Sequence, residues 1–323
     1  MGELQTIGTW WMWAGFGVFV IAMLAIDMVA LGRKGAHKVS AKEALVWSLV
    51  WFTLALLFGG VLWGWLDHTV GRAVADAKTM EYLTGYLLEK TLAMDNIFVF
   101  VMIFSYFAVP LEFQKKILVY GVLGAIVLRV LMILLGAWLI AQFHWVLYLF
   151  GAFLLITGIK MFIFADHQPD LAKNQLLKWL RSHVRITDGY HGDKFWIVEK
   201  GVRWFTPMFL VLMLIEVSDL VFAMDSIPAI FAVTSDPFIV FTSNIFAILG
   251  LRALYFLLAD MADRFHLLKY GLAVVLIFVG SKMLIVDWLK IPVAVSLGVV
   301  IAVLGMSILL SLKQSSKKRI IWD

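Results

Sequence analysis

Long apolar runs, separated by short polar segments, make up most of this chain. Nine of the runs are long enough to cross about 30 Å of hydrocarbon at about 1.5 Å per residue. A lipid-exposed backbone must satisfy its own hydrogen bonds, so we predict that each run is a helix. The predicted spans are 10–31, 43–66, 82–107, 117–142, 145–164, 207–234, 237–260, 266–286 and 291–312. This pattern predicts an all-α polytopic membrane protein, with residues 1–323 as one integral membrane domain.

Composition supports this class. Hydrophobic residues make up 63% of the chain and charged residues only 15%, whereas soluble domains carry about 25% charge. The chain has no cysteine, which excludes disulfides and thiolate metal ligands. We expect no cleavable signal peptide, because the first apolar run lacks a basic leader and a small-residue cleavage site.

Lys and Arg are concentrated in alternate connections between the spans and in the C-terminal tail. By the positive-inside rule these segments are cytoplasmic, so we place the N-terminus in the periplasm and the C-terminus in the cytoplasm, with the protein in the cell inner membrane. The net charge of +5 then reflects basic loops, and no nucleic-acid partner is expected. The longest polar segment, 165–206, becomes a cytoplasmic loop. Its amphipathic part predicts an interfacial helix.

A short acidic sequence motif occurs twice within the apolar runs. Each copy has two acids six positions apart, followed by a small oxygen-bearing residue, and one further acid precedes the second copy. Carboxylates cost about 2.5–3.5 kcal/mol each in a bilayer, so repeated placement there indicates a cation site. The candidate metal-binding residues are Glu89, Asp95, Asn96, Glu216, Asp219, Asp225 and Ser226.

The repetition extends beyond this motif. Residues 148–161 match residues 270–283 at a constant offset of 122 positions. We therefore predict two copies of a three-helix unit, 82–164 and 207–286. Because three is odd, the second copy enters the membrane from the opposite side, which gives a 3+3 inverted repeat of the kind found in secondary transporters. The two N-terminal helices (10–66) and the last helix (291–312) lie outside the repeat.

The candidate ligands carry only oxygen, which favours a hard divalent ion: Mn²⁺, Mg²⁺ or Ca²⁺. We expect Asp95 and Asp225 to face each other across a pseudo-two-fold axis, with the other candidate acids in flanking or proton-carrying positions. Pro228 is expected to unwind the sixth span and to free the carbonyl of Met224 as a further ligand.

A structural alternative stays open for the same acids. Lys90, Arg129, Arg252, Lys160 and Lys282 also lie in the repeat spans. Buried ion pairs between these bases and the acids would serve only to fix helix packing. We expect Arg129 and Arg252 to balance charge, and Lys160 and Lys282 to extend to the membrane interface.

Three stretches resemble the TerC family and, within it, the Alx-type manganese exporters of bacterial inner membranes. They are Gly85 to Asn96 (GYLLEKTLAMDN), Glu216 to Ile230, and Thr242 to Arg252 (TSNIFAILGLR). The resemblance covers nearly the whole chain. It implies a multi-spanning protein that lowers internal Mn²⁺, with the acids of the third and sixth spans as the transport site. The family also includes proteins tied to tellurium resistance and to membrane-protein assembly, so membership alone does not fix the substrate.

These observations predict an exporter of Mn²⁺ that works by alternating access, with proton exchange as one possible coupling. The alternative is a membrane-assembly or stress-resistance scaffold without transport activity. We expect no enzyme activity, because the spans contain no Ser/His or Cys/His set and no HExxH motif. No cofactor is expected beyond Mn²⁺ as the transported substrate, and the partners are this divalent ion and the lipid bilayer. The sequence leaves the oligomeric state open.

Overall fold

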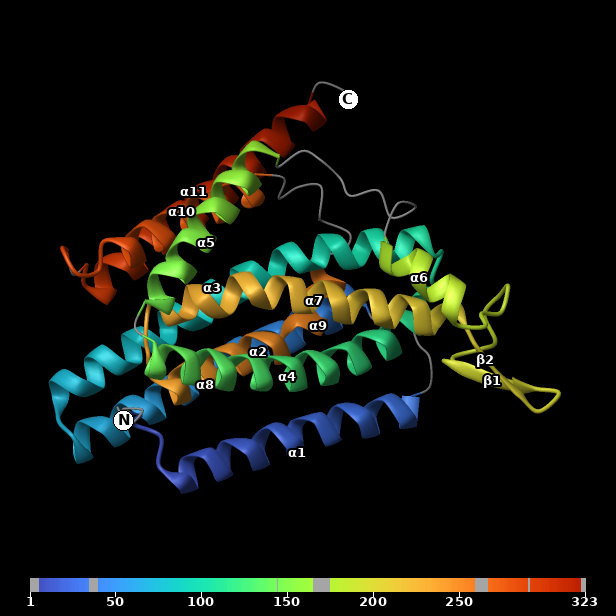
Figure 1. The fold of residues 1–323 in the computed structure, drawn as a ribbon, viewed down its shortest axis with the longest axis horizontal. Helices are drawn as coiled ribbons and strands as arrows, with labels where there is room; N and C mark the ends of the chain where they lie inside the picture. Colours follow the sequence, from blue (N-terminus) through green and yellow to red (C-terminus); the bar gives the residue numbers. More distant parts are fainter. Residues whose placement is uncertain are drawn as a thin grey trace.

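The computed structural model describes residues 6–34, 40–143, 145–164, 175–258, 267–289 and 291–320, without the side chains of 27–34, 41, 95 and 314–320. The helices and two strands run nearly parallel to one long axis, except for a tilted group that includes α5 and α10 (Figure 1). In chain order they are α1 (Trp10–Lys34), α2 (Ala41–Thr69), α3 (Arg72–Tyr106), α4 (Leu111–Gln142), α5 (Val146–Ile163), α6 (Gln175–His183), β1 (Trp196–Glu199), β2 (Val202–Phe205), α7 (Pro207–Phe231), α8 (Pro237–Leu249), α9 (Leu251–Leu258), α10 (Leu268–Leu284) and α11 (Val293–Ile320).

Six helical segments of the described chain are long and apolar enough to cross a membrane: 42–69, 111–142, 146–163, 207–231, 237–258 and 293–313. The protein is therefore a predominantly helical, multi-pass membrane protein, as predicted. Helices α1, α3 and α10 form where the other three spans were expected. However, α3 carries charged side chains along its length, and α10 has only 17 residues. Nine crossings therefore remain a prediction.

The seventh predicted span forms one membrane-crossing segment, 237–258, but the segment has a turn at Gly250, where α8 ends and α9 begins. The ammonium group of Lys90 lies against this break, where a Cβ on Gly250 would be 2.5 Å from Nζ. Lys90 Nζ donates to the carbonyl oxygen of Ala247 at 3.4 Å. A residue with a side chain at position 250 would therefore displace the lysine.

The expected unwinding at Pro228 is wrong. Helix α7 continues through this proline and ends at Phe231, less than one turn later. Membrane helices tolerate an internal proline by local adjustment, so the missing N–H does not require an unwound segment. The interrupted helix of this protein is instead the one at Gly250.

Helices α5 and α10 cross at close range through a reciprocal pair of glycines. A Cβ on Gly158 of α5 would lie 2.8 Å from the backbone nitrogen of Ile277. A Cβ on Gly280 of α10 would lie 2.6 Å from the backbone nitrogen of Leu155. The two glycines are 122 positions apart, and so are their two partners. Each helix therefore presents the same surface to the other.

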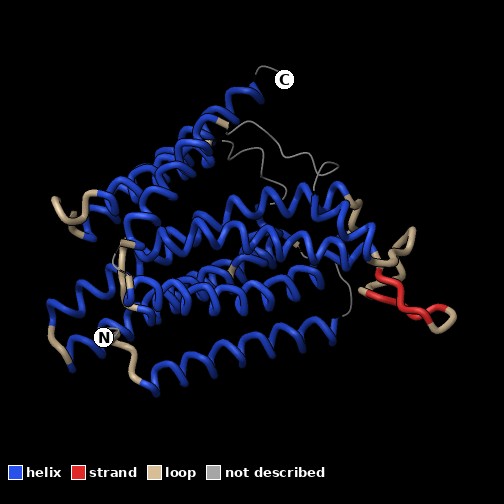
Figure 2. Tube along the Cα trace, viewed as in Figure 1, coloured by secondary structure: helices blue, strands red, loops and turns tan. Residues whose placement is uncertain are grey.

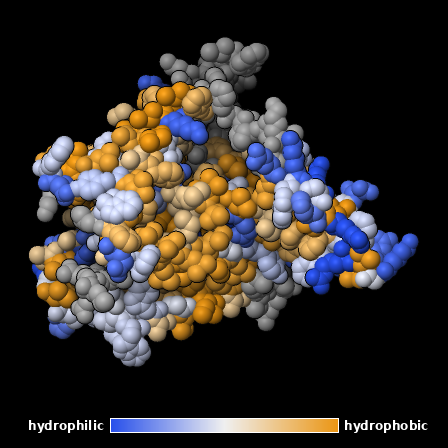
Figure 3. Space-filling view, in the orientation of Figure 1, coloured by the Kyte–Doolittle hydropathy of each residue, from blue (hydrophilic) through white to orange (hydrophobic). Residues whose placement is uncertain are grey.

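The segment between α5 and α7 contains α6 and a short hairpin of β1 and β2, which projects beyond the helices (Figure 2). Helix α6 buries Leu177 and Leu180 and leaves Trp179 exposed, so it is amphipathic as predicted. The hairpin was not predicted. Hydrophilic side chains gather over this end of the molecule, and hydrophobic ones cover most of the remaining visible face (Figure 3). Residues 165–174 of the predicted cytoplasmic loop lie outside the described part.

Candidate functional site

A single arginine on α4 joins predicted site residues from two other helices. Arg129 is 1% exposed, and its Nη1 donates to Oε1 of the fully buried Glu89 on α3. Its Nε and Nη2 donate to the two carboxylate oxygens of Asp219 on α7, at 3.3 and 3.1 Å. The fork of the guanidinium group suits this two-point contact with a carboxylate. Glu89 and Asp219 are therefore joined through a base in this arrangement.

Two neutral side chains complete the network around Arg129. Ser226 Oγ on α7 and Asn244 Oδ1 on α8 accept hydrogen bonds from Nη1 at 3.1 and 3.3 Å. Asn244 Nδ2 donates to the second carboxylate oxygen of Glu89 at 3.1 Å. Asn244 was not among the predicted site residues. The signal that points to it is the unbroken polar trio Thr242, Ser243 and Asn244 inside an apolar run.

Asp225 lies apart from this network, although it is on the same helix as Asp219. It lines a cavity of about 270 Å³, together with Thr157 and Lys160 of α5 and apolar side chains of α3, α7 and α10. The hydroxyl group of Thr157 is a polar neighbour of the Asp225 carboxylate. Within the described part of the chain, Asp225 has no ion pair.

Glu216 occupies a third position, against α4. A Cβ on Gly124 would lie 2.1 Å from Glu216 Oε1, so the carboxyl group rests directly on the surface that this glycine leaves open. The other oxygen, Oε2, is buried and accepts no hydrogen bond from the described residues. Buried polar atoms are satisfied in most proteins, so this oxygen is available as a hydrogen-bond acceptor or as a ligand of a cation.

Asn96 repeats this feature on α3. The residue is 1% exposed, and its Oδ1 is buried without a donor among the described residues. The backbone of the neighbouring Asp95 lies within α3, but its side chain lies outside the described part. The expectation that Asp95 faces Asp225 therefore stays a prediction.

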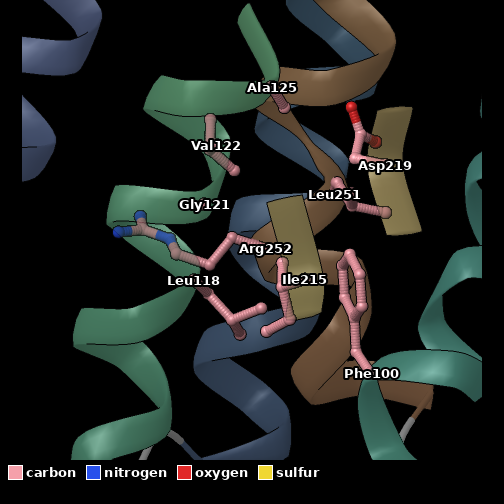
Figure 4. A pocket seen from close by; sticks show the side chains of 9 residues that line it. All are labelled: Phe100, Leu118, Gly121, Val122, Ala125, Ile215, Asp219, Leu251 and Arg252. Atoms are coloured by element: carbon pink, nitrogen blue, oxygen red, sulfur yellow. The ribbon is translucent and has the colours of Figure 1, made fainter. Parts of the chain in front are cut away.

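A small pocket adjoins the Arg129 network on the other side of Asp219. Asp219 and Arg252 both line it, and the guanidinium group of Arg252 points away from the Asp219 carboxylate (Figure 4). The volume, about 10 Å³, is roughly that of one water molecule by the same measure. The pocket therefore has no room for a hydrated metal ion.

Six of the seven predicted residues have described side chains, and these six are not joined in one hydrogen-bonded network. Glu89, Asp219 and Ser226 surround Arg129, while Asp225, Glu216 and Asn96 occupy other positions. No group of three or more Asp, Glu or His side chains placed to hold a metal ion occurs among the side chains that the structure describes. The arrangement offers one centre in which a single base pairs with two acids, and buried oxygen atoms elsewhere that this centre does not use.

Comparison with known proteins adds the following. The model of the integral membrane protein TerC family matches residues 74–319. The chain is 57% identical over 308 residues to proteins named "Putative membrane-bound redox modulator Alx" from Shigella flexneri and Escherichia coli (strain K12), covering 95% of this chain and 96% of each relative. It is 47% identical over 315 residues to "Uncharacterized membrane protein STKORF319" of Myxococcus xanthus, covering 98% and 96% of the two chains. No solved structure matches the chain significantly.

Proposed function

We propose that this chain, which belongs to the integral membrane protein TerC family, exports Mn²⁺ from the cytoplasm to the periplasm across the bacterial inner membrane. The observation that carries the proposal is the set of oxygen atoms left over once Arg129 is satisfied. Asp225 lines a cavity, and Glu216 and Asn96 each bury an oxygen that no described donor reaches. A network that served packing alone would leave few such acceptors, because each one costs about 1–3 kcal/mol.

The proposed mechanism is alternating access between two halves related by an inverted repeat, 82–164 and 207–286. The reciprocal contacts of Gly158 and Gly280 support this repeat, since an in-plane two-fold axis brings matching helices together in opposite directions. The high density of basic residues at the end with α6 and the hairpin supports a cytoplasmic C-terminus and a periplasmic N-terminus.

In this mechanism Arg129 acts as the resident cation of the transport path. It holds Glu89 and Asp219 while no metal is bound to them. A divalent ion that binds these carboxylates must displace the guanidinium group, which ties metal binding to movement of α4 against α3 and α7. Proton exchange is one way to drive the return step.

Ligand chemistry admits Mn²⁺ together with Mg²⁺ and Ca²⁺, since every candidate ligand is an oxygen atom. Alx relatives carry the name of redox modulators. This chain has no cysteine and therefore no thiol chemistry of its own. Export of a redox-active ion is a route by which such a protein influences redox balance without being an enzyme or holding a cofactor.

The test is flux in proteoliposomes with Mn²⁺, Mg²⁺ or Ca²⁺ and a pH-sensitive dye inside. We expect Mn²⁺ flux in the wild-type protein and a large loss in Asp225→Asn and Asp95→Asn. Met224→Leu is the matched control, because Met224 is next to Asp225 and faces outward. Normal flux in both aspartate variants would contradict the proposed site. Absence of flux for every ion in the wild-type protein would contradict the proposed function.

The Arg129 network favours a second candidate, a membrane-assembly or stress-resistance scaffold. Under this alternative the buried charges only position α3, α4 and α7. Asp225→Asn would then leave cellular Mn²⁺ and stress resistance unchanged, while loss of Arg129 would abolish resistance through loss of the folded protein. The two candidates thus differ in their dependence on Asp225.

A further inference from the structure

The cavity beside Asp225 follows one face of α5. The α5 positions that line it are Thr157, Lys160 and Met161, and Phe164 continues the face just beyond the helix end. These spacings of three, four and seven place all four side chains on one side of a helix. Phe164 directly precedes the predicted cytoplasmic loop. The cavity therefore extends from Asp225 towards the end of the molecule that carries the basic connections.

The opposite wall comes from α10 and leads to the same end. Leu272 and Leu276 line the cavity, and both lie in the first half of α10, which begins at Leu268. Leu92 of α3 and Phe222 of α7 close the side nearest to the Arg129 network. The cavity thus lies between the α5–α10 pair and the α3–α7 pair, and Asp225 is the one carboxylate among the described side chains that line it.

The volume suits a hydrated ion. At about 30 Å³ for each water molecule, 270 Å³ holds several waters. A divalent ion of the Mg²⁺ or Mn²⁺ type gives up its waters reluctantly and is often held through them. The Asp225 carboxylate and the Thr157 hydroxyl supply acceptors for such a hydrated ion, and Lys160 supplies a competing positive charge.

We propose that this cavity is a vestibule in which a hydrated divalent cation from the cytoplasm is first held, with Asp225 and Thr157 as its contacts and Lys160 as its competitor. The proposal rests on the proposed function, which it extends by assigning Thr157 and Lys160 and a route of access. In the other half of the repeat, the position matching Thr157 is Val279, which has no hydroxyl group. The vestibule is therefore a property of one half only.

The experiment uses the absence of native cysteine in the full-length chain. Thr157→Cys is labelled with a membrane-impermeant maleimide in inside-out and right-side-out vesicles, with and without Mn²⁺. Ile156→Cys is the matched control, since its side chain is adjacent but 65% exposed on the outer surface of α5. Phe164→Cys is a second probe of the cavity in case Cys at position 157 disturbs folding.

We expect labelling of Thr157→Cys from the cytoplasmic side only. Mn²⁺ at about ten times its Kd should slow the reaction about tenfold by mass action. Asp225→Asn should abolish this protection, and Lys160→Gln should shift it to lower Mn²⁺ concentration. Ile156→Cys should show no Mn²⁺ effect.

The vestibule is overturned if Mn²⁺ protects neither Thr157→Cys nor Phe164→Cys, or if labelling comes from the periplasmic side, in vesicles that still transport Mn²⁺. That outcome leaves export intact. A second outcome separates the two proposals in the other direction. If Mn²⁺ protects Thr157→Cys in an Asp225-dependent way but the reconstituted protein shows no flux, the vestibule binds the ion and the proposed export function is wrong.

Discussion

Lys160 and Lys282 lie 122 positions apart, near the ends of the two helices that cross at Gly158 and Gly280. Lys160 is exposed and lines the cavity beside Asp225. Lys282 is only 9% exposed, and its Nζ donates to Oγ of Ser296 on α11 at 3.0 Å. The expectation that Lys282 extends to the membrane interface is therefore wrong, because α11 covers it. Two residues that match in the predicted repeat thus have different surroundings.

The difference comes from a helix that lies outside the repeat. Helix α11 packs along α10, where Gly271 contacts Ser307 and Lys282 contacts Ser296. Within the described chain, α5 packs mainly against α10, α7 and α4, which all belong to the predicted repeat units. Helix α11 also packs against α3, so it contacts both predicted repeat units, but of the two matched lysines it covers only Lys282.

Substitution of Arg129 should cause the largest loss of stability, because this residue pairs with an acid from each of the two predicted repeat units. Arg129→Met leaves Glu89 and Asp219 buried without a counter-charge, which costs about 3–5 kcal/mol. Thermal unfolding of the purified protein in detergent measures this loss. Arg129→Lys should lose less, since it keeps the charge but not the fork. A methionine variant as stable as the wild type would show that the network does not join the halves.

Substitution of either glycine at the crossing of α5 and α10 should destabilise the protein by a similar amount. Gly158→Ala and Gly280→Ala each place a Cβ within 2.8 Å of the opposing backbone, and each should cost about 1–3 kcal/mol. The two losses should agree, since the contacts match. Gly305→Ala is the control, because no atom lies within 4 Å of a Cβ there. A large loss at only one glycine would show that the crossing is symmetric in position but not in energy.

Removal of the Ser296 hydroxyl group, which contacts Lys282, should have a smaller effect on the free energy of unfolding. Ser296→Ala takes away the partner of Lys282 and should cost about 1 kcal/mol in the same unfolding assay. Ser48→Ala offers a matched control, as Ser48 Oγ is buried without a hydrogen-bond partner in the described chain. Equal stability of both variants would mean that α11 fixes Lys282 by packing alone.

The smallest effect concerns the loop that connects the halves. Lys116 of α4 donates to Asp193 Oδ2 at 2.8 Å, and this hydrogen bond lowers the pKa of Asp193 below its usual value. The ion pair is therefore fully present above about pH 4 and is lost as the pH falls through the lowered pKa, while the hydrogen bond from Lys116 Nζ to the Asp193 carbonyl oxygen at 2.7 Å remains. Hydrogen exchange of residues 190–206 should rise in that acid range. Asp193→Asn should show the faster exchange at all pH values; an unchanged profile in this variant would exclude the contact.

The sequence was sufficient for the general architecture and for the chemistry of the buried residues. Apolar runs give the helices, and charged residues inside them are rare enough to mark Glu89, Asp219 and Arg129. It did not give their pairing, because helical geometry cannot say which base on α4 reaches which acid. Both the packing and the cation interpretation were open from the residues alone.

Two backbone features show where local reasoning stops. Pro228 has the stronger local tendency to interrupt a helix, but α7 continues through it. A glycine such as Gly250 does not by itself interrupt a helix. Here α8 nevertheless ends at Gly250, and Lys90 of α3 occupies the space beside it. The decisive contact at Gly250 comes from 160 positions away in the chain, which periodicity cannot detect.

The break at Gly250 also explains why the adjacent residues Glu89 and Lys90 do not neutralise each other. The carboxyl end of α8 carries about half a unit of negative charge from its aligned peptide dipoles, and Lys90 lies at this pole. An ammonium group can thus be accommodated there without an acid, and Glu89 turns to Arg129 instead. Exchange of the two residues would place a carboxylate at a negative pole and an ammonium group against a guanidinium group, so this adjacent pair of opposite charges has a fixed order.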